Sequence, residues 1–226
     1  MSNKPNTKKR KTKAVTATPN ATNRTIWQSP VFWIVGLVAV AAVAAVILAG
    51  GGSNSSSGSV AGETAFAEVF GTPIPPLSNP DPAIGQPVPA ISAQTLQGDR
   101  IRIENDGTAR VFGFFAHWCP HCQRELPRTA QWLETNELPD GVEVVAVSAG
   151  VDPGAGNYPP SDWFVREEWP ALVILDDEAG TLSTGLGLSG FPYWVATDSN
   201  GNVVARASGE LSTEQFEELI EAASAS

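Results

Sequence analysis

The feature that most constrains this chain is an uninterrupted apolar run at residues 31–49, which read VFWIVGLVAVAAVAAVILA. The run carries no charge, and as a helix it would be about 28 Å long. That length is close to the roughly 30 Å hydrocarbon core of a bilayer. Trp27 and Trp33 stand where interfacial aromatic residues are expected. The run therefore predicts one N-terminal transmembrane helix.

The charges on the two sides of this run differ in sign. The chain has 14 Lys and Arg against 24 Asp and Glu, a net charge of -10, yet residues 1–49 contain seven cations and no acid. Because cationic flanks remain in the cytoplasm, we expect residues 1–30 to be a disordered, basic cytoplasmic tail in a single-pass protein of the cytoplasmic membrane. The domain that follows would be extracytoplasmic. Its acidic composition argues against nucleic acid as a partner.

A cleaved signal peptide is the alternative interpretation of this segment. Its apolar core is usually about 7–15 residues and ends in a small-residue cleavage site. The run at residues 31–49 is longer, and the Gly-Gly-Gly-Ser that follows offers only a weak cleavage site. We therefore favour an uncleaved signal anchor.

Residues 50–83 have the composition of a linker. Residues 50–62 are rich in Gly and Ser, and seven prolines follow between residues 72 and 89, which indicates an extended spacer or a strap over the domain. Between these parts, we expect Phe66, Val69 and Phe70 to dock on the domain as a short amphipathic turn.

From residue 84 to the C-terminus the pattern is that of one compact α/β domain. Gly98-Asp99 and Asn200-Gly201 each predict the turn of a β-hairpin. We expect Ser161 to cap a short helix that runs to Glu168, and Ser212 to form a capping box with Gln215. Further strands are predicted at 111–116, 142–147 and 172–175, and helices from Pro120 and within 177–186. This alternation predicts a mixed sheet covered on both faces.

Both cysteines of the chain fall in one motif, Trp118-Cys119-Pro120-His121-Cys122. A structural disulfide would enclose only two residues and would stabilise little. A metal site could use His117 and His121, but His121 would point to another side of the helix, and a structural zinc site usually has a second ligand pair. Haem attachment requires a histidine directly after the second cysteine, where this chain has glutamine. We therefore predict no metal ion and no bound cofactor.

Redox chemistry is the interpretation that we favour for this motif. A helix that starts just after Cys119 would place its sulfur at the helix N-terminus, where the backbone N–H groups stabilise a thiolate. Cys122 follows one turn later on the same face and could attack a mixed disulfide. The pair would then be a reactive dithiol or disulfide.

Residues 118–127, WCPHCQRELP, together with the preceding strand, resemble the active site of the thioredoxin superfamily. The stretch 84–226 is similar to its membrane-anchored, TlpA/ResA-like branch, through IGQPVPA before a hairpin and Gly-Phe-Pro before the last strand pair. The resemblance implies a thioredoxin fold, a central mixed sheet flanked by helices with an N-terminal β-hairpin extension. It also implies that Pro192 is cis and lies against the cysteines, and that Phe191 offers its backbone to a substrate.

Two departures from the family pattern bear on the chemistry. The Pro120-His121 dipeptide, next to Trp118, is similar to that of the oxidising DsbA type, so we expect these three residues to tune the redox potential. Gly113 occupies the position where thioredoxin has a buried aspartate. Glu125 matches a glutamate of the TlpA/ResA pattern and is the candidate for proton transfer, unless it is merely a solvated helix carboxylate.

We therefore predict a protein thiol–disulfide oxidoreductase with Cys119 and Cys122 as catalytic residues. Its expected partners are extracytoplasmic proteins with thiols or disulfides and a membrane redox partner for recycling. The motif favours an oxidase and the TlpA-like pattern a reductase, so the direction stays open. The alternatives are a copper or other metal chaperone that uses the same cysteines, and an interaction protein with an inactive motif.

Overall fold

The computed structural model describes residues 65–225. The predicted tail, the apolar run at residues 31–49 and the Gly/Ser-rich segment lie outside these residues. Within the described part of the chain, no helix is long and apolar enough to cross a membrane.

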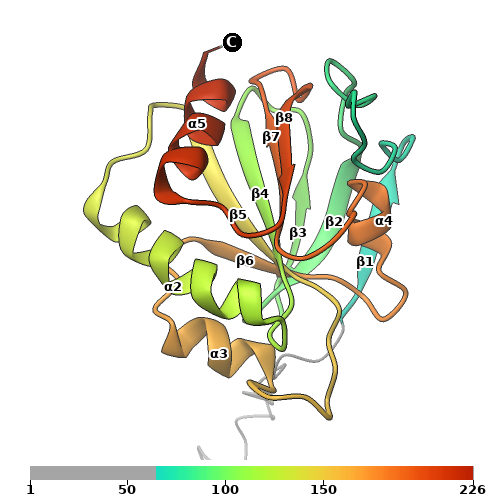
Figure 1. The fold of residues 1–226 in the computed structure, drawn as a ribbon. Coiled ribbons are helices and arrows are strands. Elements are labelled where there is room, and N and C mark those ends of the chain that lie inside the picture. Colours follow the sequence, from blue (N-terminus) through green and yellow to red (C-terminus); the bar gives the residue numbers. More distant parts are fainter. Residues whose placement is uncertain (1–64, 226) are drawn as a thin grey trace, which may run out of the picture. The chain divides into compact units, whose positions relative to one another are not determined.

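One mixed sheet of eight strands forms the centre of the fold (Figure 1). The strands are β1 (Ala67–Phe70), β2 (Ala90–Thr95), β3 (Arg100–Ile103), β4 (Ala109–Phe115), β5 (Val142–Ser148), β6 (Leu172–Leu175), β7 (Tyr193–Thr197) and β8 (Val203–Ser208). Their order is β1-β2-β6-β5-β4-β7-β8, and β3 pairs with β2. Strands β4, β5 and β6 are parallel to one another, whereas β7 is antiparallel to β4. The predicted mixed sheet is confirmed.

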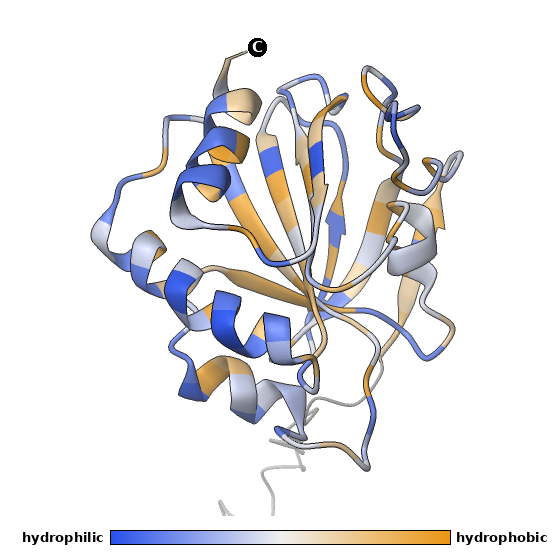
Figure 2. Ribbon diagram, in the orientation of Figure 1, coloured by the Kyte–Doolittle hydropathy of each residue, from blue (hydrophilic) through white to orange (hydrophobic). Residues whose placement is uncertain are grey.

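Four helices accompany the sheet in the described residues: α2 (Pro120–Thr135), α3 (Pro160–Arg166), α4 (Thr181–Gly185) and α5 (Thr213–Ser224). Alternation along β4 shows how they are divided between the faces. Val111 and Phe115 belong to a core shared with α2, α3 and α5. Phe112 and Phe114 belong to the core on the other face, which includes α4. Apolar residues accordingly line the strands, while the outer surface of α2 is hydrophilic (Figure 2).

The local turn and cap signals hold for most elements. Strands β2 and β3 form the predicted hairpin, as do β7 and β8. The capping box of Ser212 and Gln215 is present at the start of α5. The prediction for α3 was wrong at both ends, because Pro159 rather than Ser161 is the N-cap and the helix ends at Arg166. Pro160 occupies the first helical position. Proline suits this position, since its fixed φ matches a helix and the N–H that it lacks would have no partner there.

The segment before residue 84 packs with the domain. Residues 67–70 dock on the domain as expected, but as strand β1, antiparallel to β2, and not as a short amphipathic turn. The side of β2 that does not pair with β3 supplies hydrogen-bond partners for residues 67–70, and a local turn would leave these backbone groups of β2 unpaired. Ile74 and Ala83 are buried with the core that contains α4. The folded part thus begins before the predicted boundary at residue 84.

Arg206 on β8 holds this proline-rich segment in place. Its guanidinium donates to both carboxylate oxygens of Asp81, to the carbonyl oxygen of Pro75 and to the hydroxyl of Tyr193. The Arg206 side chain is fully buried. Hydrogen bonds from Arg206 lower the pKa of Asp81, so the pair is ionised over the ordinary pH range. We call residues 72–83 the strap.

Candidate active site

Cys119 sits at the N-cap of α2, at the point where the loop after β4 turns into the helix. Its backbone is extended there, and Pro120 occupies the first helical position. The Cys119 Sγ lies 3.7 Å from the carbonyl oxygen of Phe191. The side chain is only 6% exposed. A thiolate at this position would face the free N–H groups of the first helical turn, as the sequence predicted.

Cys122 lies one turn further into α2 and is completely buried. Burial raises the pKa of its thiol far above the ordinary range, and the neighbouring Cys119 and Glu125 raise it further. Both cysteines are free thiols in this structure. The two thiols therefore differ in reactivity. Cys119 stands at the N-terminal end of the helix, whereas Cys122 needs a base before it can react.

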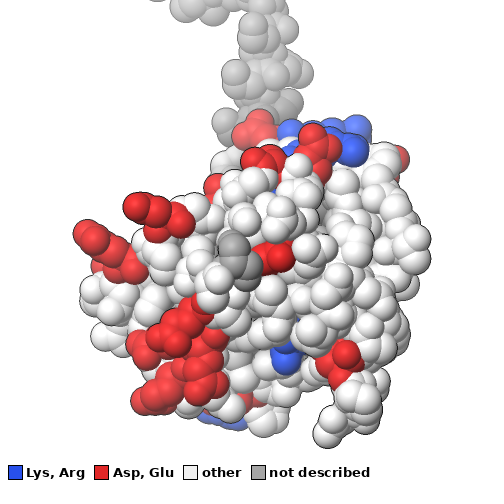
Figure 3. Space-filling view, turned by 90° about the horizontal axis from the view of Figure 1, so that it is seen from above, with Lys and Arg blue, Asp and Glu red and all other residues white. Residues whose placement is uncertain are grey.

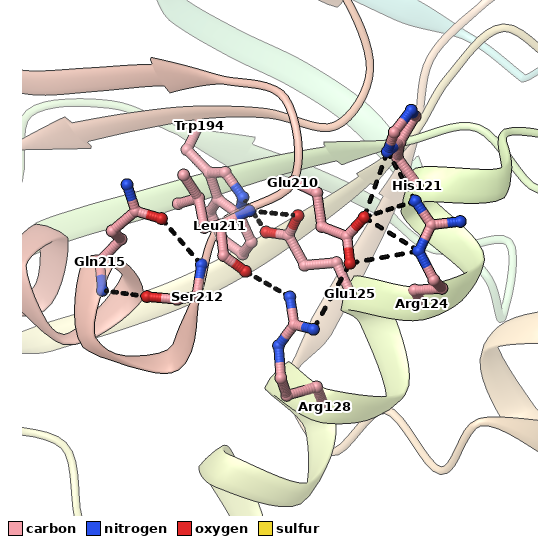
Figure 4. Close-up of polar contacts among 9 residues, drawn as sticks. All are labelled: His121, Arg124, Glu125, Arg128, Trp194, Glu210, Leu211, Ser212 and Gln215. Atoms are coloured by element: carbon pink, nitrogen blue, oxygen red, sulfur yellow. Dashed lines mark hydrogen bonds and ion pairs between the residues drawn. The ribbon is translucent and has the colours of Figure 1, made fainter.

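Glu125 follows Cys122 by three residues on α2 and acts on it electrostatically, and it is 1% exposed. Its Oε1 accepts a hydrogen bond of 2.6 Å from Trp194 Nε1, and its Oε2 accepts one of 3.0 Å from the Leu211 amide (Figure 4). Burial raises the pKa of Glu125 from 4.5 to about 7, against the effect of these two donors. The alternative of a solvated helix carboxylate is excluded by this burial.

Gly113 explains how Trp194 reaches Glu125. The two residues are direct partners on strands β4 and β7. A Cβ atom placed on Gly113 would lie 2.5 Å from the Trp194 ring, so only glycine leaves room for the indole. At the position where thioredoxin has a buried aspartate, this chain has Gly113. The Trp194 indole fills the space beside it and donates a hydrogen bond to Glu125 on α2.

His121 does not hydrogen-bond to either cysteine sulfur among the interactions found in residues 65–225. Its Nδ1 lies 3.1 Å from Glu210 Oε2 and 2.7 Å from Arg124 Nη2 (Figure 4). Nδ1 can donate to the carboxylate or accept from the guanidinium, but it cannot do both at once. Arg124 also lies within electrostatic reach of Cys119, and Glu210 raises the pKa of Arg124. The cation near the nucleophile is thus Arg124, which the sequence did not single out.

His117 holds the loop beside the motif rather than a metal ion. Its Nε2 accepts from the Asp152 amide, at 3.1 Å, and its Nδ1 lies 2.8 Å from the Gly156 carbonyl oxygen. With Nε2 as an acceptor, Nδ1 is the donor to the Gly156 carbonyl oxygen. Both ring nitrogens are therefore occupied. In residues 65–225 no group of three or more His, Cys, Asp or Glu side chains could hold a metal ion.

Aromatic residues form the surface around Cys119. Trp118 is 40% exposed and donates a hydrogen bond of 2.6 Å to the Gly150 carbonyl oxygen. Its ring meets the half-buried Phe191 ring edge-on, at 6.0 Å between centroids. The Phe191–Pro192 peptide bond is cis, as the resemblance implies. The structure thus brings Trp118 and the Phe191–Pro192 peptide together with Cys119.

Comparison with known proteins identifies the family of this chain. The profile of the Redoxin family matches residues 83–222. The chain belongs to the Redoxin family. Among curated relatives, the sporulation thiol-disulfide oxidoreductase A of Bacillus subtilis is 25% identical over 135 residues, which cover 59% of this chain and 80% of that protein. The thiol-disulfide oxidoreductase ResA of Bacillus thuringiensis is 27% identical over 139 residues, 61% of this chain and 76% of ResA.

Solved structures show the same fold. The crystal structure of StoA from Bacillus subtilis matches with a TM-score of 0.50 and 23% identity, covering 61% of this chain and 98% of that one. A thioredoxin family protein from Chlorobium tepidum matches with a TM-score of 0.51 and 22% identity, over 61% and 94% of the two chains. The thioredoxin-like fold and the assignment to TlpA/ResA-like thiol–disulfide oxidoreductases are confirmed.

Proposed function

We propose that this chain exchanges the Cys119–Cys122 dithiol or disulfide with cysteines of other proteins outside the cytoplasmic membrane. The observation that supports this most is the difference between the two sulfurs. Cys119 caps α2 beside the Phe191 carbonyl oxygen, whereas Cys122 lies fully buried behind it next to Glu125.

In the reducing direction, the Cys119 thiolate attacks a substrate disulfide, an S–S bond forms to Cys119, and one substrate thiolate leaves. Cys122 then gives its proton to the Glu125 carboxylate and attacks the Cys119 sulfur. The second substrate sulfur leaves and takes up a proton, and a Cys119–Cys122 disulfide remains. Two electrons have passed to the substrate, and the oxidising direction is the reverse.

The surroundings of Cys119 support a protein substrate. The exposed Trp118 and the half-buried Phe191 offer an apolar surface, and the Phe191 backbone beside the sulfur can pair with an extended peptide. We propose further that residues 31–49 anchor the chain in the cytoplasmic membrane, and that a membrane dithiol protein recycles the pair. These proposals rest on the apolar run and the charge distribution.

Trapping of mixed disulfides tests the proposed roles. Cys122→Ser leaves the nucleophile without its resolving thiol, so covalent complexes with substrate proteins should accumulate and should dissolve on reduction. Cys119→Ser is the matched control and should trap little, because the remaining sulfur is buried. Equal trapping by both variants would contradict the role division, and exchange by neither the wild type nor the variants would contradict the function.

A further inference from the structure

We propose that Trp194 is a positioning residue for the exchange reaction, and that together with the Leu211 amide it holds Glu125 at Cys122. The inference rests on the proposed function, since it concerns the proton that Cys122 must lose. In this arrangement strand β4 supplies no acid but only the space at Gly113, and strand β7 supplies the hydrogen-bond donor.

The Trp194 ring is enclosed by its neighbours. It is fully buried, opposite Gly113 in the β4–β7 pairing. Phe115 meets it edge-on with 5.4 Å between ring centroids, and Phe216 from α5 packs against it at 5.1 Å. These neighbours direct the indole N–H at Glu125 Oε1, 2.6 Å away. The Trp194 ring thus connects strand β7 of the sheet to Glu125 on α2.

The Leu211 amide, the second hydrogen-bond donor to Glu125, is held in place by contacts on both sides. Arg128 of α2 donates to the Leu211 carbonyl oxygen, and Glu210 makes ion pairs with Arg124 and Arg128. The capping box of α5 begins at the next residue, Ser212. The turn that carries the Leu211 amide is therefore tied to α2 and to α5, as Figure 4 shows.

Both donors favour the ionised carboxylate, whereas burial favours the protonated acid. The charged or titratable groups that face Glu125 are Cys122 and Arg128 from α2 and Glu210 from the turn; strand β7 faces it with the neutral indole. Without the indole donor, the pKa of Glu125 would rise further above its value of about 7. The acid would then hold its own proton at neutral pH and could not accept that of Cys122.

The test is Trp194→Phe in the full chain, with Trp132→Phe as the matched control. Trp132 Nε1 also donates to a carboxylate, Glu217 Oε1, at 2.7 Å, but between α2 and α5 and away from the cysteines. The rate at which the mixed disulfide is resolved should rise with pH as Glu125 ionises, which gives the pH profile a rising limb. In Trp194→Phe we expect this limb to shift to higher pH by about one pH unit. The rate at neutral pH should fall by about threefold to tenfold. Trp132→Phe should leave the limb in place.

A spectroscopic measurement separates positioning from packing. With isotope-labelled tryptophan, the Trp194 indole N–H resonance should move with pH as Glu125 titrates, and it should stop doing so in Glu125→Gln. An unmoved limb in folded Trp194→Phe would overturn the inference while the proposed function stands. An indole resonance that does not follow Glu125 would overturn it too, even if Trp194→Phe fails to fold. Absence of exchange in the wild type would overturn both.

Discussion

Cys122 and Glu125 lie three residues apart on α2, both are almost completely shielded from solvent, and each carboxylate oxygen of Glu125 accepts a hydrogen bond. A buried thiol that must lose a proton therefore has a buried carboxylate beside it. The pKa of Glu125, about 7, puts this acid near the point of half-ionisation at neutral pH. An acid in that range can both accept and return a proton during exchange.

The first prediction concerns the pH dependence of folding stability. The pKa of Glu125 is raised from 4.5 to about 7 in the folded chain, so the folded state binds more protons than the unfolded state between these values. The stability contributed by this group is thus present at low pH and is lost as pH rises from about 4.5 to about 7, by up to about 3 kcal/mol. Denaturant unfolding at several pH values, compared between wild type and Glu125→Gln, should show that this loss disappears in the variant.

The second prediction concerns the redox potential. Arg124 acts electrostatically on Cys119, whereas the hydrogen bonds of His121 go to Arg124 and Glu210. Removing a cation near the thiolate destabilises the reduced form, so Arg124→Gln should make the potential more negative. A glutathione-buffered titration should show a larger shift for Arg124→Gln than for His121→Ala. A larger effect of His121→Ala would assign the tuning to the histidine instead, as the sequence suggested.

The same titration decides the direction of the reaction. The Pro120-His121 dipeptide predicts a potential less negative than the roughly -270 mV of thioredoxin, which would favour an oxidase. A more negative value would favour a reductase. Arg102→Gln is a suitable control for Arg124→Gln, because Arg102 also pairs with a glutamate, Glu104, but lies on β3 and not on the helix that carries the nucleophile.

The third prediction concerns the strap. Asp81→Asn leaves the buried Arg206 without its carboxylate, which should lower the free energy of unfolding by about 3 kcal/mol. Glu104→Gln is the matched control, because its ion pair with Arg102 is exposed and such pairs contribute less than about 1 kcal/mol. Denaturant unfolding measures both. Equal losses would show that the buried pair does not hold the strap.

The stability from this pair should also depend on pH. Hydrogen bonds from Arg206 lower the pKa of Asp81 below 3.8 in the folded chain. Its contribution is therefore complete above about 4 and is lost as pH falls through the lowered value. In Asp81→Asn the free energy of unfolding should therefore fall less steeply at low pH than in the wild type. An unchanged fall would assign the acid sensitivity to other carboxylates.

The fourth prediction concerns topology. With the proposed anchor at residues 31–49, a protease that cannot cross membranes should digest the domain of wall-stripped cells and spare the N-terminal tail. Immunodetection of a tag at each end distinguishes the fragments. Digestion of the tail with an intact domain would reverse the orientation, and release of the domain without protease would indicate a cleaved signal peptide.

Local signals made much of the catalytic helix predictable. Pro120 marks the first helical position of α2, and the spacing of the cysteines places both sulfurs near its start. The hairpin turns and the capping box likewise depend on neighbouring residues, which a sequence displays directly. These elements were predicted because their causes lie within a few residues.

The contacts that prepare the site were not predictable in this way. Trp194 meets Glu125 across 69 residues of chain, and Arg124 meets Glu210 across 86. Nothing near Glu210 distinguishes it from the other acids of this acidic domain, many of which lie on the face shown in Figure 3. One signal was available for Trp194, since a glycine inside a buried strand indicates close approach by a neighbour. Strand β1 was missed because its partner residues on β2 lie about 20 to 26 positions away in the sequence.

The strap also determines how mechanical load would enter the molecule. A pull on the chain at residue 65 acts first on β1, whose hydrogen bonds to β2 would be loaded in shear, and next on the link between Asp81 and Arg206. The strand order places β1 at one edge of the sheet and β8, which carries Arg206, at the other, and β2, β6 and β5 stand between β1 and β4, the strand that leads to Cys119 (Figure 1). Tension on a membrane tether would thus be met first at the two edges of the sheet, before it reached the strand that leads to the reactive sulfurs.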